Sequence, residues 1–212
     1  MQHAKKCAVK LPVWLLTAVI SLGNQVFASD QRILSAQNSS IEFSVQILGV
    51  IKKNGQFTDF NGRFERQTGS PEKAFVWLSI RSGSARMRSK KDTEMVKGED
   101  FFAATQFPEV RFDSEPFDAK LLFDSKASHP INGHLSLRGR RLPETLNLKV
   151  LACVELAALD KCSFQVDGKL NRARYGMQSH RAFVGDDVRL SLTIHSEGEV
   201  ESGKAQGELQ KE

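Results

Sequence analysis

Alternation of apolar and polar residues is the dominant pattern of this 212-residue chain from residue 41 onward. From Ile41 to Ile47, large apolar residues occupy every second position, with Glu, Ser and Gln between them. This period of two is typical of a β-strand with one buried face. Further strand-like segments, bounded by Gly, Pro, Asn or Asp, lie at 116–123, 131–137, 145–150, 163–170 and 188–194. We therefore expect a mainly all-β domain of seven to nine antiparallel strands, which must close on itself or meet a second sheet.

The turn after the first strand has two signals. Gly49 and the run Lys52–Gly55 (KKNG) both favour a turn. The chain then returns through Phe57 and Phe60, whose spacing of three breaks the alternation and predicts a bulge beside Gly62.

Residues 74–80, AFVWLSI, are apolar on both faces. This pattern predicts a strand that is covered on both sides. Val76, Leu78 and Ile80 would face an interior, while Phe75 and Trp77 would meet an outer layer.

One short helix is expected at Lys90–Lys97, with Ser89 as its N-cap and Gly98 as its stop. It is the obvious candidate for the outer layer over Phe75 and Trp77. It leads into an aromatic corner made by Phe101, Phe102 and Phe107, which is followed by Pro108 and a strand containing Val110 and Phe112.

Three regions divide the chain. Residues 1–28 combine two early lysines, an apolar segment at 11–22 and the small-residue site Val26–Ala28, which predicts a signal peptide cleaved after Ala28 and a periplasmic location. The apolar segment is shorter than the ~20 residues of a membrane span, and Cys7 precedes it, which disfavours a lipoprotein. Residues 29–195 form the domain, and the polar residues 196–212 are expected to be a disordered tail.

Charge and motifs exclude several kinds of function. The leader carries three lysines and no acid, so the rest of the chain has 27 basic and 25 acidic residues and gives no electrostatic reason to bind nucleic acid. The four histidines outside the leader are scattered, and no metal-binding motif is present. No G-x-S-x-G or other nucleophile motif is found, so we assign no catalytic residue, no metal and no cofactor. Asp100, Asp113, Asp186 and Asp187 are interpreted as residues that cap and solvate turns.

The two cysteines outside the leader are Cys153 and Cys162. In an exported protein, such a pair is most simply a disulfide. Their spacing is not C-x-x-C, which disfavours a redox-active pair.

The order of several motifs resembles the YceI-like family of periplasmic lipid-binding proteins. The helix is followed by Asp100-Phe101-Phe102 and by Phe107-Pro108-x-Val110-x-Phe112-x-Ser114. Further matches are the opening segments 40–49 and 55–62, then Gly133-x-Leu135-x-Leu137-x-Gly139, Arg172-x-x-Tyr175-Gly176-Met177 and Val184–Val188. Together these matches span roughly residues 38 to 194.

This resemblance implies an extended, lipocalin-like antiparallel β-barrel of about eight strands, with the short helix packed at the aromatic corner. It also implies that a polyisoprenoid or fatty-acyl lipid lies in the barrel. Burial of each methylene group would contribute ~0.8 kcal/mol to binding, so no specific polar contact would be needed. Without the resemblance, the apolar strand residues would be read simply as core. The residues expected to line the cavity are Phe43, Val45, Phe57, Val76, Leu78, Phe101, Phe102, Phe112, Leu135, Leu190 and Leu192.

A polar head group would need different partners. Arg138, Arg140 and Arg172 are interpreted first as a solvated rim; if the barrel opens near them, they could bind an anionic head group. The family often has histidines before its first strand and before the first glycine turn, and this chain has Asn38 and Leu48 there.

Two other functions stay open: a lipid or prenyl-ester hydrolase on the same scaffold, and an interaction module with a filled barrel. The partners expected are an apolar lipid, transiently a membrane, and a second copy in a homodimer.

Overall fold

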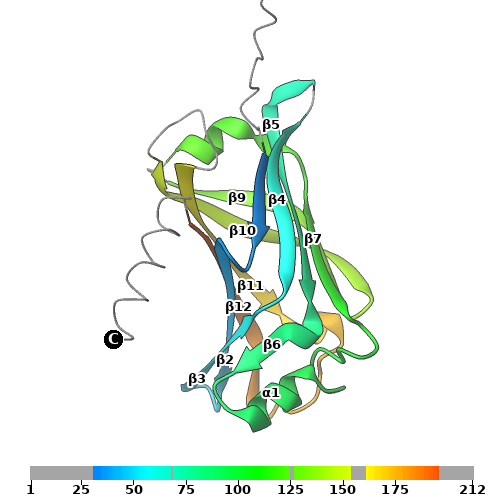
Figure 1. Cartoon of the computed structure of the whole chain (residues 1–212). Coiled ribbons are helices and arrows are strands. Elements are labelled where there is room, and N and C mark those ends of the chain that lie inside the picture. Colours follow the sequence, from blue (N-terminus) through cyan, green and yellow to red (C-terminus); the bar gives the residue numbers. More distant parts are fainter. Residues whose placement is uncertain (1–30, 68, 125–126, 154–160, 196–212) are drawn as a thin grey trace, which may run out of the picture.

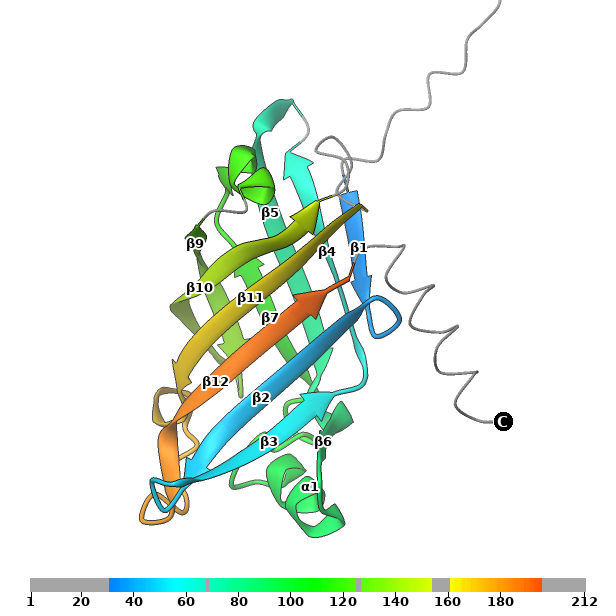
Figure 2. The same ribbon diagram turned by 90° about the vertical axis from the view of Figure 1, so that its left-hand side faces the viewer.

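The computed structural model describes residues 31–67, 69–124, 127–153 and 161–195. The predicted signal peptide (1–28) and polar tail (196–212) lie outside the described residues. Twelve strands form a single antiparallel sheet in the order β1-β4-β5-β7-β9-β10-β11-β12-β2-β3-β6, with β8 paired to β5. The sheet curls strongly on itself into a half-barrel that is longer than it is wide (Figures 1 and 2).

The strands are β1 (Gln31–Ser35), β2 (Ser39–Ile47), β3 (Ile51–Phe57), β4 (Phe60–Gln67), β5 (Ser70–Arg81), β6 (Ala85–Met87), β7 (Glu109–Ser114), β8 (Phe117–Asp118), β9 (Ser128–Leu137), β10 (Arg140–Cys153), β11 (Cys162–Asn171) and β12 (Val184–Ile194). The helix α1 covers Lys90–Lys97, and the described 3₁₀ helices include η1 (Ser82–Ser84), η2 (Ala119–Phe123) and η4 (Arg172–Tyr175). The expected all-β, lipocalin-like architecture is confirmed. The strand number is higher than the expected eight because short segments such as β1, β6 and β8 join the sheet.

Period-two alternation determines which side chains face the inside of the curl. In β2, Ile41 and Phe43 are buried and Glu42 is exposed, and in β5 Val76, Leu78 and Ile80 are buried. Phe64 of β4 and Phe164 of β11 stack across the interior, with their ring centroids 5.6 Å apart. The hydrophobic core therefore lies inside the curl, between opposite walls of one sheet.

The first turn is shorter than predicted and includes Gly49 but not the run Lys52–Gly55. The run Lys52–Gly55 lies inside β3, and the turn is Ile47–Val50, where the Val50 amide donates to the Ile47 carbonyl at 3.2 Å. A Cβ at position 55 would lie 2.3 Å from the Phe43 ring. Gly55 is therefore required by the ring that packs on it, and not by a turn.

Two other local predictions were wrong. The predicted bulge near Gly62 is absent from the described β4–β5 and β1–β4 ladders there, since Gly62 pairs regularly with Leu34 and Leu78. The unusual spacing of Phe57 and Phe60 instead spans the bend between β3 and β4. The strand expected at 116–123 is mostly the 3₁₀ helix η2, whose N-cap Asp118 accepts a hydrogen bond from the Lys120 amide.

The helix has the predicted bounds but not the predicted position. The Ser89 side chain accepts a hydrogen bond from the Asp92 amide, and Gly98 caps the other end. Instead of covering Phe75 and Trp77, α1 packs beside β6 at one end of the half-barrel (Figure 1). Trp77 faces outward, with the guanidinium of Arg111 5.5 Å from its ring centroid. On the outer side of β5, the Trp77 ring is therefore partly covered by the Arg111 side chain and not by α1.

The predicted disulfide is confirmed. Cys153 and Cys162 occupy opposite positions where β10 meets β11, with a Cα–Cα distance of 4.1 Å. The bond therefore fastens the two strands where they meet.

Gly133 of β9 is paired with Ser114 of the neighbouring strand β7. A Cβ at this position would lie 2.5 Å from the Asp113 carbonyl oxygen and 2.8 Å from the Ser114 Cα. Because these are backbone atoms, we expect Gly133→Ala to lower the free energy of unfolding by ~1–3 kcal/mol, measured by urea denaturation. In the control Gly83→Ala, the nearest atom is 4.0 Å away, and we expect almost no change. Equal losses in the two variants would contradict this explanation.

Candidate functional site

A cavity of about 190 Å³ lies inside the curl, at the end of the half-barrel that carries α1. An apolar cavity of ~150 Å³ is known to hold one benzene molecule, so this cavity has room for roughly seven or eight carbon atoms of an apolar chain. Thirty residues line it, and all are apolar except Lys53, Asp92, Glu144, Arg172, Tyr175 and Ser191. Such a space favours an extended apolar ligand over a polar one.

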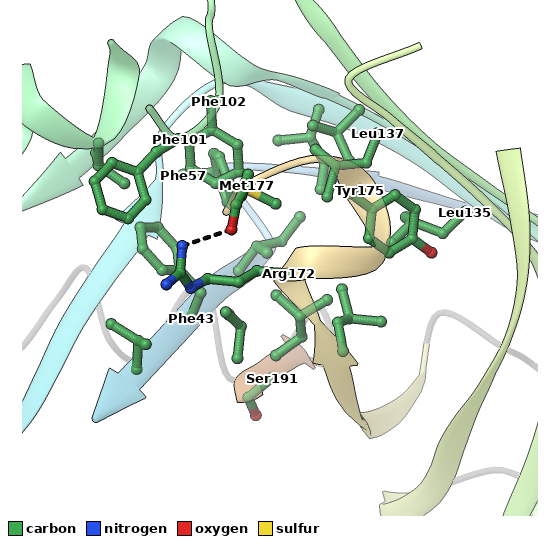
Figure 3. A pocket seen from close by; sticks show the side chains of 18 of the residues that line it. Phe43, Phe57, Phe101, Phe102, Leu135, Leu137, Arg172, Tyr175, Met177 and Ser191 are labelled. Carbon is green, nitrogen blue, oxygen red and sulfur yellow. Dashed lines mark hydrogen bonds between the residues drawn. The ribbon is translucent and has the colours of Figure 1, made fainter. Parts of the chain in front are cut away.

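An aromatic cluster forms one wall of the cavity (Figure 3). The ring centroids of Phe43 and Phe57 are 5.2 Å apart, and the Phe102 ring lies 5.9 and 5.4 Å from them. Phe102 is placed by the loop after α1, where its amide donates to the Val96 carbonyl at 3.0 Å. The aromatic corner expected from the sequence therefore joins helix, loop and sheet at the cavity.

Ten of the eleven residues expected to line a cavity do so in the structure. The exception is Val76, which is buried but lies in register with Phe64, where the stacked rings of Phe64 and Phe164 occupy the interior. The expected list omitted other lining residues, most of which obey the same alternation or lie on α1. These include Ile41, Ile47, Met87, Met95, Val96, Val110, Leu137, Leu146, Val166, Leu170, Val184 and Val188. Ile80, which was expected to face an interior, also lines the cavity, and Met177 does so from the loop after η4.

The Arg172 side chain forms hydrogen bonds to backbone carbonyls of its own chain. Its Nε donates to the Gly185 carbonyl at 3.0 Å, its Nη1 to the Met177 and Ser179 carbonyls at 2.6 and 2.9 Å, and its Nη2 to the Val184 carbonyl at 2.9 Å. Asp186 Oδ1 lies 3.5 Å from Nη2. Four of the five guanidinium N–H groups are thus hydrogen-bonded to backbone carbonyls, and Nη2 also forms an ion pair with Asp186. Arg172 therefore holds the loop between η4 and β12 in place and is engaged mainly within its own chain.

The other two candidate arginines lie outside the cavity lining. Arg138 donates from Nη1 to the Phe101 carbonyl at 2.6 Å and thereby fixes the aromatic corner. Arg140 donates to the Arg174 carbonyl at 2.7 Å and is exposed. Arg138 and Arg172 both contact Phe101, and the Arg140 guanidinium lies beside Gly176, so the three arginines are near one another, but each donates to backbone carbonyls of its own chain.

One ion pair lies at the edge of the cavity near α1. Lys53 Nζ and Asp92 Oδ2 are 2.8 Å apart, which joins β3 to the first turn of the helix. The hydrogen bond from Lys53 holds the pKa of Asp92 below its ordinary value, against a smaller opposing effect of burial. This charged pair is largely satisfied within the protein, so it adds little polarity to the cavity.

Comparison with known proteins identifies the family. A model of the YceI-like domain matches residues 33–196, well over half of the chain. The chain belongs to the YceI-like family. The matched residues contain every motif on which the resemblance was based, from the first strand to β12.

Curated relatives share this YceI-like domain at low identity. A UPF0312 protein of Pseudomonas aeruginosa (strain LESB58) is 26% identical over 185 residues, which cover 84% of this chain and 94% of that protein. A UPF0312 protein of Azotobacter vinelandii (strain DJ) is 23% identical over 189 residues, with the same coverage.

Solved structures show the same YceI-like fold. BcnA of Burkholderia cenocepacia superposes with a TM-score of 0.61 at 16% identity, covering 74% of this chain and 94% of BcnA. A polyisoprenoid binding domain from Saccharophagus degradans, implicated in plant cell wall breakdown, gives a TM-score of 0.55 at 12% identity and covers 78% of this chain and 97% of that domain.

Within the described ranges, no three His, Cys, Asp or Glu side chains are grouped so that they could hold a metal ion. None of the described helices has the length and apolar character that a membrane span needs.

Tyr175, on the wall of the cavity, has a strongly shifted pKa. Its hydroxyl donates to Glu144 Oε1 at 2.8 Å, and Arg174 Nη1 lies 2.9 Å from the same oxygen. Burial raises the pKa of Tyr175 well above its usual value, and the hydrogen bond to the Glu144 carboxylate adds to this effect.

Ionisation of Tyr175 should therefore destabilise the fold at high pH. Because the folded pKa lies above the unfolded value of ~10, the stability that this group contributes is present below pH ~10 and falls as the pH rises further. The chain has a single tyrosine, so the ultraviolet absorbance of phenolate reports Tyr175 alone. We expect it to titrate near pH ~10 in denaturant and at higher pH in the native protein. Titration at the same pH in both states would contradict this expectation, and Tyr175→Phe should remove the signal.

Proposed function

We propose that this protein binds a long apolar lipid, a polyisoprenoid or a related acyl chain, inside the half-barrel. The observation that carries the proposal is the cavity, whose lining is apolar apart from six residues. Burial of each methylene group contributes ~0.8 kcal/mol. Six or more methylenes therefore give affinity in the millimolar to micromolar range before any ordering cost, without a specific polar contact.

The polar lining residues support binding more than catalysis. Arg172 and the Lys53–Asp92 pair are engaged within the protein, and Ser191 donates to Asp167 at 2.8 Å. A hydrolase would need a nucleophile beside a base, but the carboxylate beside the Ser191 hydroxyl, Asp167, is exposed and lies outside the cavity lining. The cavity also favours a binding protein over a module with a filled barrel.

The S. degradans domain of similar fold is described as polyisoprenoid binding, which makes a prenyl chain the ligand to test first. The leader at 1–28 supports export to the periplasm. We therefore assign the protein the role of a periplasmic carrier or sequestering protein, which takes up a lipid reversibly and shields it from water.

The proposal is tested by the lipid that the protein retains. The protein is purified without detergent from the periplasm of a bacterial host, and its native and denaturing mass spectra are compared before and after organic extraction. We expect a stoichiometric adduct that extraction removes.

The extracted protein is then titrated with prenyl alcohols and fatty acids of graded length. Affinity should rise about fourfold per added methylene, which corresponds to ~0.8 kcal/mol, until the cavity is full. Absence of binding across both series would refute the proposal.

A further inference from the structure

Four exposed apolar side chains lie together at one end of the molecule. They are Leu48, Val50 and Ile51, in and after the β2–β3 turn, and Phe183, directly before β12, with exposed fractions of 58, 81, 50 and 59%. We call these four residues the apolar tip. The described residues include three other large apolar side chains that are similarly exposed, Ile33, Met95 and Leu151. The concentration of four at one place marks an interaction surface.

The tip is one continuous structure, although its residues are far apart in the sequence. The Leu48 amide donates to the Phe183 carbonyl at 2.7 Å, and the neighbouring residues Ile47 and Val184 are partners in the β2–β12 ladder. Figure 2 shows the β2–β3 turn and the loop before β12 projecting side by side at the lower end of the half-barrel, next to α1.

The backbone conformation at residue 48 is unfavourable for leucine, so the stability of the fold does not explain why leucine is found there. Leu48 and Gly49, the central residues of the turn, have φ values of 51° and 72°. Asn, Asp or Gly is preferred at such positions, because other side chains are strained there. Arg138 and Gly139 have the same φ signs in the β9–β10 turn, but there the side chain is polar and hydrogen-bonded to Phe101. A strained residue that also exposes an apolar side chain points to a role outside folding.

The apolar surface of the tip continues into the cavity. Ile47 and Val184, the chain neighbours of Leu48 and Phe183, both line the cavity, as does the partly exposed Met95 of α1. A long apolar ligand could therefore pass from the tip to the cavity along apolar side chains.

We propose that the apolar tip inserts into the surface of a phospholipid bilayer, so that a lipid moves between bilayer and cavity without crossing water. Aliphatic and phenylalanine side chains on a projecting turn suit insertion among acyl chains. The exposed Lys52 and Arg181 flank the tip, and Arg181 is paired with Asp186, so Lys52 is the cation that can remain at the head-group level. The cargo in this inference rests on the proposed function, but the insertion itself does not.

The test measures binding of the purified periplasmic protein to large unilamellar vesicles. Vesicles of phosphatidylcholine, and of phosphatidylcholine with about one fifth phosphatidylglycerol, are sedimented with wild type and with the double variant Leu48→Asn/Phe183→Ser. We expect the variant to lose at least tenfold in its partition coefficient for both vesicles. Asn tolerates the positive φ of residue 48, and the Phe183 side chain is exposed, so the double variant should keep the unfolding free energy of wild type and lost binding would not reflect unfolding.

A control variant removes two other exposed apolar side chains, elsewhere on the molecule. Ile33 of β1 and Leu151, near the end of β10, are exposed to a similar degree, and these strand segments lie toward the opposite end of the half-barrel. The variant Ile33→Ser/Leu151→Ser should bind vesicles like wild type. Equal loss in both double variants, or no loss in either, would overturn the proposal.

Cargo binding is measured separately, by adding the lipid from solvent in the absence of vesicles. Wild type that binds lipid but not vesicles would overturn the membrane proposal and leave the proposed function intact. Wild type that binds vesicles through the tip but holds no lipid would overturn the proposed function and support the membrane proposal. Self-association through the tip, abolished by the tip variant and without vesicle binding, would assign the surface to a second copy and overturn the proposal.

Discussion

Leu190→Trp is expected to abolish lipid binding while the protein stays folded. Leu190 lies on β12, lines the cavity and is only half-buried, so a larger side chain can enter the open space without displacing a tightly packed core. The indole ring would take the place of four or five ligand methylenes. At ~0.8 kcal/mol each, their loss corresponds to ~3–4 kcal/mol and a 100- to 1,000-fold higher Kd. Calorimetric titration of the extracted protein with a prenyl alcohol measures the change.

The neighbouring residue provides the control. Arg189 lies on the same strand but is exposed, so Arg189→Trp places an identical ring on the outer face. We expect this variant to bind lipid with unchanged affinity. The free energy of unfolding of both variants should stay within about one kcal/mol of the wild-type value. Wild-type affinity in Leu190→Trp would show that the ligand does not occupy this cavity.

Alternation predicted the direction of the side chains because it is a local property of a strand. Each second residue of β2, β5 and β12 faces the interior whatever the sheet pairs with. Whether an inward side chain meets a ligand space or another side chain depends on the opposite wall of the curl. Val76 and Leu78 show the difference, since both are buried on β5 but only Leu78 reaches the cavity. Their neighbours in space lie on strands far away in the sequence, so no local pattern separates them.

Glycines and arginines were harder to interpret for the same reason. Gly49 and Gly55 look alike in the sequence, yet one adopts a positive φ in a turn and the other lies flat under the Phe43 ring. Arg172 was expected at the rim because arginine is rarely buried. Its partners are carbonyl groups, which every residue carries and which leave no signature in the sequence. The helix α1, by contrast, was predicted with its correct bounds because its caps are local.

Arg172→Met should cause the largest loss of stability among the substitutions considered. The Arg172 side chain is buried, and its removal leaves four carbonyl groups, those of Met177, Ser179, Val184 and Gly185, without their donor. It also removes the cation 5.8 Å from the Phe101 ring centroid. The hydrogen bond to Met177 is buried and the other three are partly buried. An unpaired buried group costs ~1–3 kcal/mol and a broken buried ion pair ~3–5 kcal/mol, so we expect ~4–5 kcal/mol of lost unfolding free energy. This is a large part of the ~5–15 kcal/mol that holds a typical domain folded.

The control for this variant is the arginine on the other side of the same carboxylate. Arg181 also pairs with Asp186, but its side chain is exposed, and pairs of this kind contribute only ~0–1 kcal/mol. Urea denaturation should therefore give a midpoint close to wild type for Arg181→Ala and a much lower one for Arg172→Met, with Arg172→Lys between them because Lys keeps the charge but not the planar set of donors. If Arg181→Ala were as damaging as Arg172→Met, the charge of Asp186 would matter more than the four carbonyl groups. Because those groups connect η4 to the start of β12, amide exchange in residues 176–185 should quicken in Arg172→Lys before the rest of the sheet is affected.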